Sequence, residues 1–467
     1  MSLKAWSILP LSLAMTGCVS MAPRYRTPEP PVPKAWPEGP AYKAGAATSP
    51  AAHELPWRDF YLDEGMRKVL NLALETNRDL RIAALRTEQA RAYYRIQRAD
   101  LLPKVNAFAQ GTKQRLPASV SGTGQALVVE QDQAGVGISA WELDFFGRVR
   151  SLKNRALEQY LATEQAQDSA RISLLAEVAN VYLALATDRE SLALAQETLA
   201  SQEASYKLIQ RRFEVGASSE IDARRAQVSV DAARGDVAVF TRAVAIDRNA
   251  LDLLVGAPVP AELLPASLGS VTPLKDITPG LPSEVLTHRP DILMAEHQLK
   301  AANADIGAAR AAFFPRISLT TSVGTMGNEL SGLFKSGSST WAFSPQIVLP
   351  IFDTGARRAN LKATEAGRDI ALAQYEKAIQ VAFREVADAL AQRGTLDDQL
   401  AAQESLTQAL ERTHSLAKAR YDAGIDSYLG VLDAQRSLYS AQQGVIALRR
   451  ARYGNLVGLY KVLGGGR

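Results

Sequence analysis

The chain has 467 residues, of which 47% are hydrophobic and 22% charged, and its formal net charge is +4. This composition is typical of a globular or coiled-coil protein and excludes a largely disordered chain. The small net charge does not indicate a broad basic surface, so we expect no nucleic-acid partner.

The first residues have the layout of a secretory signal peptide, which we assign to residues 1–17. Lys4 precedes a mainly apolar stretch, and Thr16 and Gly17 lead directly to Cys18, the only cysteine of the chain. The apolar stretch is too short for a permanent membrane helix. A lone cysteine cannot form an internal disulfide.

The residues MTGC that end this segment resemble a bacterial lipobox, although Met15 stands where that pattern prefers leucine. The resemblance implies that Cys18 becomes the acylated first residue of a mature lipoprotein. By the sorting rule for such lipoproteins, the resemblance also implies the outer rather than the inner membrane, because Val19 and not an aspartate follows Cys18. The alternative is an ordinary signal peptide followed by an incidental cysteine.

A proline-rich segment follows, and residues 18–62 are expected to form an extended N-terminal strap. Regular structure is expected from about Asp63, where apolar residues begin to recur at helical spacing. A second helix is expected from about Arg78 to Asp100, and it must end before Pro103.

The pattern then changes from helical to alternating, which predicts a β-hairpin over about residues 104–144. Val105, Ala107 and Ala109 alternate with Asn106, Phe108 and Gln110, and an alternating pattern recurs from residue 134 to residue 140. Between them, a loop rich in glycine and serine is expected to extend to about Gln131. Gly147 ends the hairpin.

From about residue 152 to residue 213 no proline or glycine interrupts the chain. A helix of this length would extend for roughly 90 Å at ~1.5 Å per residue. Its apolar residues follow a heptad pattern, which Asp188 and Gln202 interrupt. After a turn at Gly216, a return helix is expected from about Glu220 to Leu254.

A linker over residues 259–282 leads to a second run of elements in the same order. We expect a helix from His288 to Phe314, a hairpin over about residues 316–351 with strands at 316–325 and 340–351, a long helix over about 357–422, and a return helix from Tyr428.

The two halves are an internal duplication, because equivalent residues recur at one constant spacing. Gly216 and Gly424 align in this way, as do Gln227 and Gln435. We therefore divide the chain after the strap into a first structural repeat, residues 63–258, and a second, residues 283–467. Their helical hairpins have their tips near residues 216 and 424.

Beyond the signal segment we identify no apolar run of the ~18 residues that a membrane helix needs, so any crossing is expected to use strands. The four expected strands, of about ten residues each, match the length of ~9–11 residues that crosses a bilayer obliquely. Four strands cannot close a barrel, however, and open edges are not tolerated in lipid. Several copies of the chain are therefore expected to pool their strands.

Several motifs together carry a family resemblance: MTGC, Pro103 and Pro315, WELDFFGRVRS, VLPIFDTGARRANL, the two turns and the ending VGLYKVLGGG. Over essentially the whole mature chain, the sequence resembles TolC-type outer-membrane efflux channels. Within them it is similar to the OprM-like lipoprotein branch of resistance, nodulation and division (RND) pumps. The resemblance implies a mainly α fold with membrane β structure, in which a homotrimer forms one 12-stranded outer-membrane barrel. A mixed equatorial region and a long periplasmic α-helical barrel would continue it.

The resemblance also implies partners, namely outer-membrane lipid, a periplasmic adaptor protein and an inner-membrane RND transporter. The adaptor would dock on the two hairpin tips, whose residues are Val215, Gly216, Ala217, Ala423, Gly424 and Ile425. The two glycines most simply supply a turn conformation that other residues rarely adopt.

The resemblance places a periplasmic gate in the second repeat. Asp433 matches an aspartate that lines the closed aperture, where three copies would bring like charges together and favour cations. Leu429 matches the apolar constriction beside it, and Tyr421 and Arg436 match residues that hold neighbouring helices closed. From the pattern alone, the simpler reading is a solvated helix face, since Leu429, Asp433 and Arg436 recur at four and three residues.

Two further positions bear on this gate. Asp188 is either a register-setting polar residue paired across helices or part of a second polar ring in the lumen. Arg225 stands where the second repeat has Asp433, so the two repeats differ in charge at this point. We therefore expect the gate on the second repeat and a structural and docking role for the first.

The sequence contains no pattern typical of an enzyme or a metal site. Its four histidines are scattered, and His288 with His297 lacks the spacing of a helical zinc pair. We expect no cofactor beyond a covalent lipid on Cys18.

The function that the resemblance implies is a passive exit duct for antibiotics, solvents and other toxic small molecules in the outer membrane of a Gram-negative bacterium. The alternatives are a duct for type I protein secretion and a lipid-anchored coiled-coil adaptor or scaffold without a pore. An adaptor would normally need one helical hairpin, whereas this chain has two.

Overall fold

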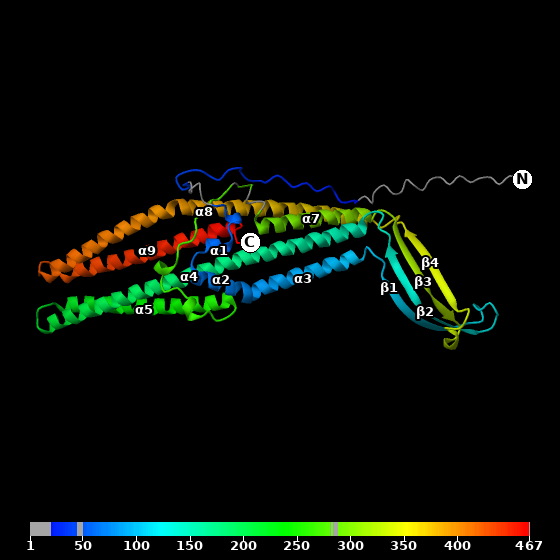
Figure 1. The fold of residues 1–467 in the computed structure, drawn as a ribbon, viewed down its shortest axis with the longest axis horizontal. Helices are drawn as coiled ribbons and strands as arrows, with labels where there is room; N and C mark the ends of the chain where they lie inside the picture. Colours follow the sequence, from blue (N-terminus) through cyan, green and yellow to red (C-terminus); the bar gives the residue numbers. More distant parts are fainter. Residues whose placement is uncertain (1–19, 44–49, 281, 284–287, 467) are drawn as a thin grey trace. The chain divides into compact units, whose positions relative to one another are not determined.

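A computed structural model of the chain describes residues 20–43, 50–280, 282–283 and 288–466 (Figure 1). The predicted signal peptide and Cys18 lie outside these residues. The chain forms two compact units. The sheet unit takes its residues from 1–29, 86–163 and 295–375, and the hairpin unit from 30–85, 164–294 and 376–467. Each unit therefore combines segments of both sequence repeats.

The sheet unit contains a four-stranded antiparallel sheet whose strands lie in chain order. The strands are β1 Val105–Leu116, β2 Leu127–Glu142, β3 Arg316–Gly327 and β4 Ser339–Val348, with a short turn η5 Leu330–Gly332 before β4. The pairing of β2 with β3 joins the predicted hairpins of the two repeats into a single sheet. β1 and β4 are the edges of that sheet.

The first hairpin is longer than its alternating pattern predicts. Its pairing continues without a break from Val105, opposite Ile138, to Leu116, opposite Leu127. Lys113 and Glu130 also form an ion pair across the two strands, at 2.5 Å. The prediction of a loop extending to about Gln131 is therefore wrong. Backbone pairing and a cross-strand ion pair hold these residues in the strands, and neither requires apolar and polar residues to alternate.

A bulge interrupts β2 near its end. The pairing with β3 shifts between Ile138 and Trp141, so that Ser139 and Ala140 together face Thr320. Ala140 has a φ of 49°, and its N–H donates to the Oγ1 atom of Thr320 at 3.1 Å. Because an extra residue of this kind bends a strand, the regular alternation predicted up to Ala140 ends at Ile138.

The last strand, β4, ends at Val348 rather than at the predicted Ile351. Pro350 has no backbone N–H and cannot donate to a strand ladder, which explains the earlier end. Ile351 is 93% exposed in this chain.

The predicted helices of both repeats are present. The shorter helices α3 Arg78–Ala99 and α7 Pro290–Ala311 have 22 residues each, and the long helices α4 Arg148–Glu214 and α8 Ala356–Asp422 have 67 each. The return helices are α5 Glu220–Val255 and α9 Tyr428–Val462.

Each long helix begins beside an aspartate that caps its first turn. The carboxylate of Asp144 accepts the backbone N–H groups of Val149 at 3.2 Å and Arg150 at 2.8 Å. Asp353 accepts the N–H of Arg357 at 2.9 Å in the second repeat. A carboxylate at this position satisfies N–H groups that have no partner within the helix. It therefore accounts for the start of α4 a turn before the predicted residue 152.

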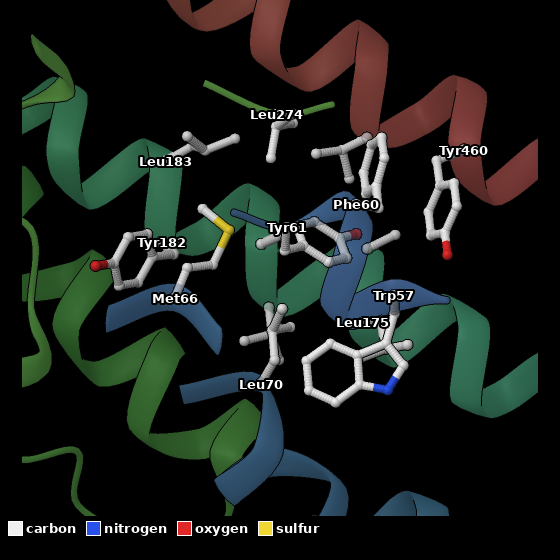
Figure 2. Close-up of a cluster of buried hydrophobic side chains, with 14 of the residues drawn as sticks. Trp57, Phe60, Tyr61, Met66, Leu70, Leu175, Tyr182, Leu183, Leu274 and Tyr460 are labelled. Carbon is white, nitrogen blue, oxygen red and sulfur yellow. The ribbon is translucent and has the colours of Figure 1, made fainter. Parts of the chain in front are cut away.

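The core of the hairpin unit includes residues that were expected to lie in the strap (Figure 2). Trp57 and Phe60 belong to a short helix α1 Trp57–Phe60, which follows a turn η2 Ala52–Glu54. The ring of Phe60 stacks on Tyr460 of α9, with ring centroids 3.9 Å apart. The prediction that regular structure begins only near Asp63 is wrong. Short helices form before it, and their aromatic side chains pack into the core. Asp63 instead caps the next helix, α2 Glu64–Thr76.

The predicted linker between the repeats also contributes to this core. It contains two short turns, η3 Ala261–Leu263 and η4 Leu268–Ser270. Leu268 and Ile277 are almost fully buried. The N–H of Lys275 donates to the carbonyl oxygen of Phe60 at 3.1 Å. The linker is therefore packed against the strap end and the helices of the hairpin unit.

Residues 20–43 of the strap have neither helix nor strand, as predicted, whereas its later residues form η2 and α1. Within the sheet unit, the hydroxyl of Tyr25 donates to Glu296 of α7 at 3.0 Å. Within the hairpin unit, the ring of Trp36 stacks on Phe383 of α8, with centroids 5.0 Å apart. The strap is therefore held by side-chain contacts in both units.

Candidate functional site

The two hairpin tips have the same backbone geometry. α4 and α8 are each followed by a left-handed glycine, Gly216 with φ 74° and Gly424 with φ 73°. The N–H of Ile425 donates to the carbonyl oxygen of Arg420 at 2.9 Å, and the first tip has the equivalent bond. This is the Schellman arrangement of helix ends, in which glycine adopts the left-handed conformation without steric cost. The prediction that these glycines supply the turns is confirmed.

Both tips present small and apolar residues to solvent. Val215 is 78% exposed and Ile425 is 63% exposed, and the neighbouring Ala217 and Ala423 are exposed as well. A side chain added at either tip glycine would meet nothing within 4 Å. These residues are therefore available for a partner, although their role in docking an adaptor stays a prediction.

The two hairpins are joined below their tips by a residue that the sequence analysis missed. Arg212 of α4 donates from Nη1 to the hydroxyl oxygen of Tyr421 of α8 at 2.8 Å, and its guanidinium lies 5.4 Å from the centre of the Tyr421 ring. The Tyr421 ring meets Tyr428 of α9 edge-on, with centroids 5.1 Å apart. Tyr421 thus bonds across the hairpins within one chain.

The repeat contains a signal that could have identified Arg212. Its equivalent in the second repeat, Arg420, pairs with Asp426 of its own turn through two bonds of 2.5 and 3.1 Å. The first repeat has Ser218 in place of that aspartate. Arg212 therefore has no acid in its own turn to pair with, and its guanidinium bonds to Tyr421 instead.

A small apolar cluster supports this contact. Its buried residues come from α4, α5 and α9, and they are Ile209, Ala223, Ala226, Tyr428, Val431 and Leu432. Tyr421 packs against the same cluster. The Arg212 bond therefore lies beside a desolvated apolar contact, where a hydrogen bond is stronger than in water.

The predicted gate residues of α9 share an exposed face. Leu429 is 39% exposed, and Asp433 and Arg436 are exposed as well, whereas Val431 and Leu432 between them are buried. In the described part of a single chain, neither Asp433 nor Arg436 has an ion-pair partner. The geometry fits a solvated face or a face that meets other copies, so the gate role of these residues stays a prediction.

Asp188 lies beside a second carboxyl group, that of Asp247 on α5. Burial, and then the negative charge of Asp188, raises the pKa of Asp247 to about 6, while Arg450 of α9 opposes the shift. Asp188 also lines a cavity of about 920 Å³ together with Glu385 of α8 and Arg450. It therefore interacts across helices and borders a polar space, which leaves both predicted interpretations open.

We expect the protein to be less stable at pH 8 than at pH 5. The pKa of Asp247 is raised in the folded state, so protonation of this carboxyl group favours folding. The stability that the group contributes is fully present below its pKa in the unfolded chain, about 3.9. That stability is lost as the pH rises through about 6. Asp247→Asn should flatten the change in thermal midpoint between pH 5 and pH 8, measured by circular dichroism on detergent-solubilised protein. Asp231→Asn, at an exposed position of α5, is the control, and a wild-type midpoint that does not fall would contradict the prediction.

The structure brings together two of the histidines that the sequence analysis treated as scattered. The rings of His53 and His288 stack with centroids 4.0 Å apart. His297 instead contacts Glu158, at 2.7 Å. Among the residues that the structure describes, no group of three or more histidine, cysteine or acidic residues could hold a metal ion.

One long helix, α4, contains a stretch that is long and apolar enough to cross a membrane by composition alone. The prediction that no such stretch lies beyond the signal segment is therefore wrong. The structure buries 67% of it inside the protein, which is typical of a core helix.

Comparison with known proteins gives concordant results for sequence and structure. The family model described as "Outer membrane efflux protein" matches residues 69–257 and 281–465. The chain is 48% identical to the toluene efflux pump outer membrane protein TtgC of Pseudomonas putida, over 98% of this chain and 95% of that protein. The fold is similar to that of a membrane protein from Pseudomonas aeruginosa, with a TM-score of 0.90, 46% identity, and coverage of 96% of this chain and 98% of the other.

A further similar structure is the open state of the MtrE outer membrane channel of Neisseria gonorrhoeae. The TM-score is 0.87 and the identity 38%, over 96% of this chain and 98% of that one. The similarity therefore extends over both units of the chain and is not confined to one of them.

Proposed function

The chain belongs to the outer membrane efflux protein family, and on this premise we propose that it is the exit duct of a three-component efflux pump of the RND class. It is an outer-membrane efflux protein and not an enzyme. The observation that carries the proposal is the sheet, whose four strands leave β1 and β4 as unpaired edges.

The unpaired edges support assembly of several copies of the chain, and we infer from the family that the assembly is a homotrimer. Lipid provides no hydrogen-bond partners for backbone groups, so β1 and β4 must pair with the β4 and β1 of neighbouring copies. Three copies would give twelve strands. That number exceeds the eight at which side chains just fill the interior of a barrel, and it therefore leaves room for a pore.

The N-terminus and the tips support the remaining contacts of the pump. Acylation of Cys18 would anchor the chain in the outer membrane, in line with the lipobox-like MTGC. The exposed apolar tips around Val215 and Ile425 would dock a periplasmic adaptor that connects to an inner-membrane transporter. Apolar residues that are exposed in a single chain are typical of such interaction surfaces.

The gate would lie on the second repeat. Three copies of the exposed face that carries Leu429, Asp433 and Arg436 would surround the axis near the tips, where the three carboxylates would narrow the pore and favour cations. Opening would separate the hairpins, and the Arg212–Tyr421 bond is one of the contacts that it would break.

The cargo we propose is antibiotics, solvents and other toxic small molecules. Support comes from the relatives, which are described as toluene and antibiotic efflux pump outer membrane proteins. The same descriptions favour efflux over protein secretion. The similarity to these relatives covers both β-hairpins and both helical hairpins, which disfavours a scaffold without a pore.

We expect the purified protein to form heat-resistant oligomers and to conduct ions in planar bilayers. Asp433→Ala should raise the single-channel conductance and weaken its dependence on the cation, because three carboxylates leave the aperture. Glu411→Ala, at an exposed position of α8, should leave both unchanged. A wild-type protein without conductance would contradict the duct, whereas an unchanged conductance in Asp433→Ala would contradict the gate alone.

A further inference from the structure

A polar cavity lies where the sheet meets the helices within the sheet unit. It has a volume of about 390 Å³, and its lining includes Lys104, Trp141, Glu142, Arg148 and Arg316. Glu142 ends β2 and Arg316 begins β3. The cavity therefore lies at the end of the sheet where the chain passes between strands and helices. Figure 1 shows this end of the sheet, where β2 leads to α4 and α7 leads to β3.

The bulge in β2 borders this cavity. Ser139 and Ala140 line it, and Ala140 has the left-handed φ of 49° that residues other than glycine rarely adopt. Backbone strain of this kind persists where the surrounding structure imposes it, and it is frequent at binding sites. The bulge also redirects the strand, so that Trp141 lines the cavity.

The side chains that line the cavity carry more positive than negative charge. Arg148 donates to both carboxylate oxygens of Glu142, at 2.8 and 2.7 Å, and Nε of Arg316 lies 2.7 Å from the same carboxylate. Two guanidinium groups thus share one acid. Lys104 pairs with Asp100, at 2.7 Å, so the three basic residues of the lining face two acidic ones.

Donors remain available for a ligand. The Arg316 side chain is 60% exposed and that of Lys104 is 67% exposed. The Nε1 atom of Trp141 is buried and has no hydrogen-bond partner among the described residues. A group that accepts several hydrogen bonds and carries negative charge would satisfy these donors, and a phosphate has both properties.

Two neighbouring features point to a lipid as the source of the phosphate. Leu102 in the lining and Val105 at the start of β1 are exposed, at 69% and 68%, so apolar side chains flank the basic ones. The strap also reaches this end of the sheet, because a side chain added at Gly307 would lie 2.7 Å from the Ala22 nitrogen and 2.6 Å from Ser151 in the first turn of α4. Ala22 follows Cys18 by four residues in the sequence.

We propose that this cavity binds the phosphate headgroup of an anionic phospholipid from the periplasmic leaflet of the outer membrane, through Lys104, Arg316 and Trp141. The proposal rests on the function proposed above, because it needs the strands to cross the membrane with the helices in the periplasm. A lipid bound there would hold the base of the barrel at the surface of the periplasmic leaflet.

The test is binding of phosphatidylglycerol to the intact detergent-purified oligomer, measured by native mass spectrometry, with phosphatidylcholine for comparison. The wild-type protein should prefer phosphatidylglycerol. Lys104→Gln and Arg316→Gln should each weaken that binding about fivefold, as expected for one basic residue near an anionic surface. Arg316→Lys should bind at an intermediate level, because it keeps the charge but not the planar fork.

Arg115→Gln is the matched control, because Arg115 is an exposed arginine of β1 towards the other end of the sheet. Binding that is the same in all variants would overturn the proposal. So would displacement of phosphatidylglycerol by millimolar inorganic phosphate, since that result would show a site for free phosphate. Planar-bilayer conductance of the same preparations separates the two proposals, because conducting variants with unaltered lipid binding contradict the lipid site alone.

Discussion

Arg212→Ala is expected to shift the channel towards its open state. The hydrogen bond from Arg212 to Tyr421 joins the two hairpins near their tips, at 2.8 Å. A hydrogen bond from a charged donor contributes about 1.5–3 kcal/mol, so its loss should favour the open state by about tenfold or more. The measurement is the open probability of single channels in planar bilayers.

Variants of both partners determine whether the bond itself is responsible. Tyr421→Phe keeps the ring that packs against Tyr428 and removes only the hydroxyl, so it should open the channel in the same direction. If both residues act through one bond, the double variant Arg212→Ala with Tyr421→Phe should open it no further than the single variants. Arg211→Ala, at the exposed neighbouring position, is the control. Additive effects of the two substitutions would contradict this mechanism.

The architecture of the repeats could be predicted from the sequence because its signals are local. The signals are left-handed glycines at both tips, prolines after the shorter helices and the heptad pattern of apolar residues in the first long helix. Each constrains the backbone at the residue concerned. Gly216 and Gly424 adopt nearly the same φ. The repeat therefore specified equivalent helices in both halves.

The features that the sequence did not reveal depend on long-range contacts. Trp57 and Phe60 lie in a proline-rich segment, and only their packing against distant helices makes them core residues. The extension of the first hairpin depends on pairing with the opposite strand. Neither contact changes the periodicity of the segment in which it occurs, so neither can be predicted from local sequence patterns.

The candidate site shows the same division between local and distant signals. The tip glycines and the exposed face of α9 could be located from the repeat and from helical spacing. The Arg212–Tyr421 bond could not be located in this way, because it joins the two repeats. It also depends on a difference between them, since the first repeat has Ser218 where the second has Asp426. Arg212 and Arg420 are equivalent residues with different partners. A residue that lacks the partner of its equivalent is available for a contact between the repeats.

Gly324→Ala is expected to abolish assembly of the membrane sheet. Gly324 of β3 lies opposite Gly135 of β2, where the hairpins of the two repeats join. A Cβ atom at Gly324 would lie 2.2 Å from the carbonyl oxygen of Ala134 and 2.7 Å from the Cα atom of Gly135. Both are backbone atoms, so no change of rotamer relieves the overlap, and the cost should reach at least the ~3 kcal/mol at the upper end for overpacked sites.

The substitution should disrupt the oligomer while the helices of each chain remain folded, because the strands of every copy are needed to close the barrel. We expect heat-resistant oligomers to be lost on gels of outer-membrane extracts, while circular dichroism still shows the helical signal. Gly332→Ala is the matched control, since a Cβ atom at Gly332 in η5 would meet nothing within 4 Å. Oligomers of Gly324→Ala as abundant as those of Gly332→Ala would mean that the β2–β3 junction tolerates a side chain. Closure of the barrel would then not depend on the close approach of these two strands.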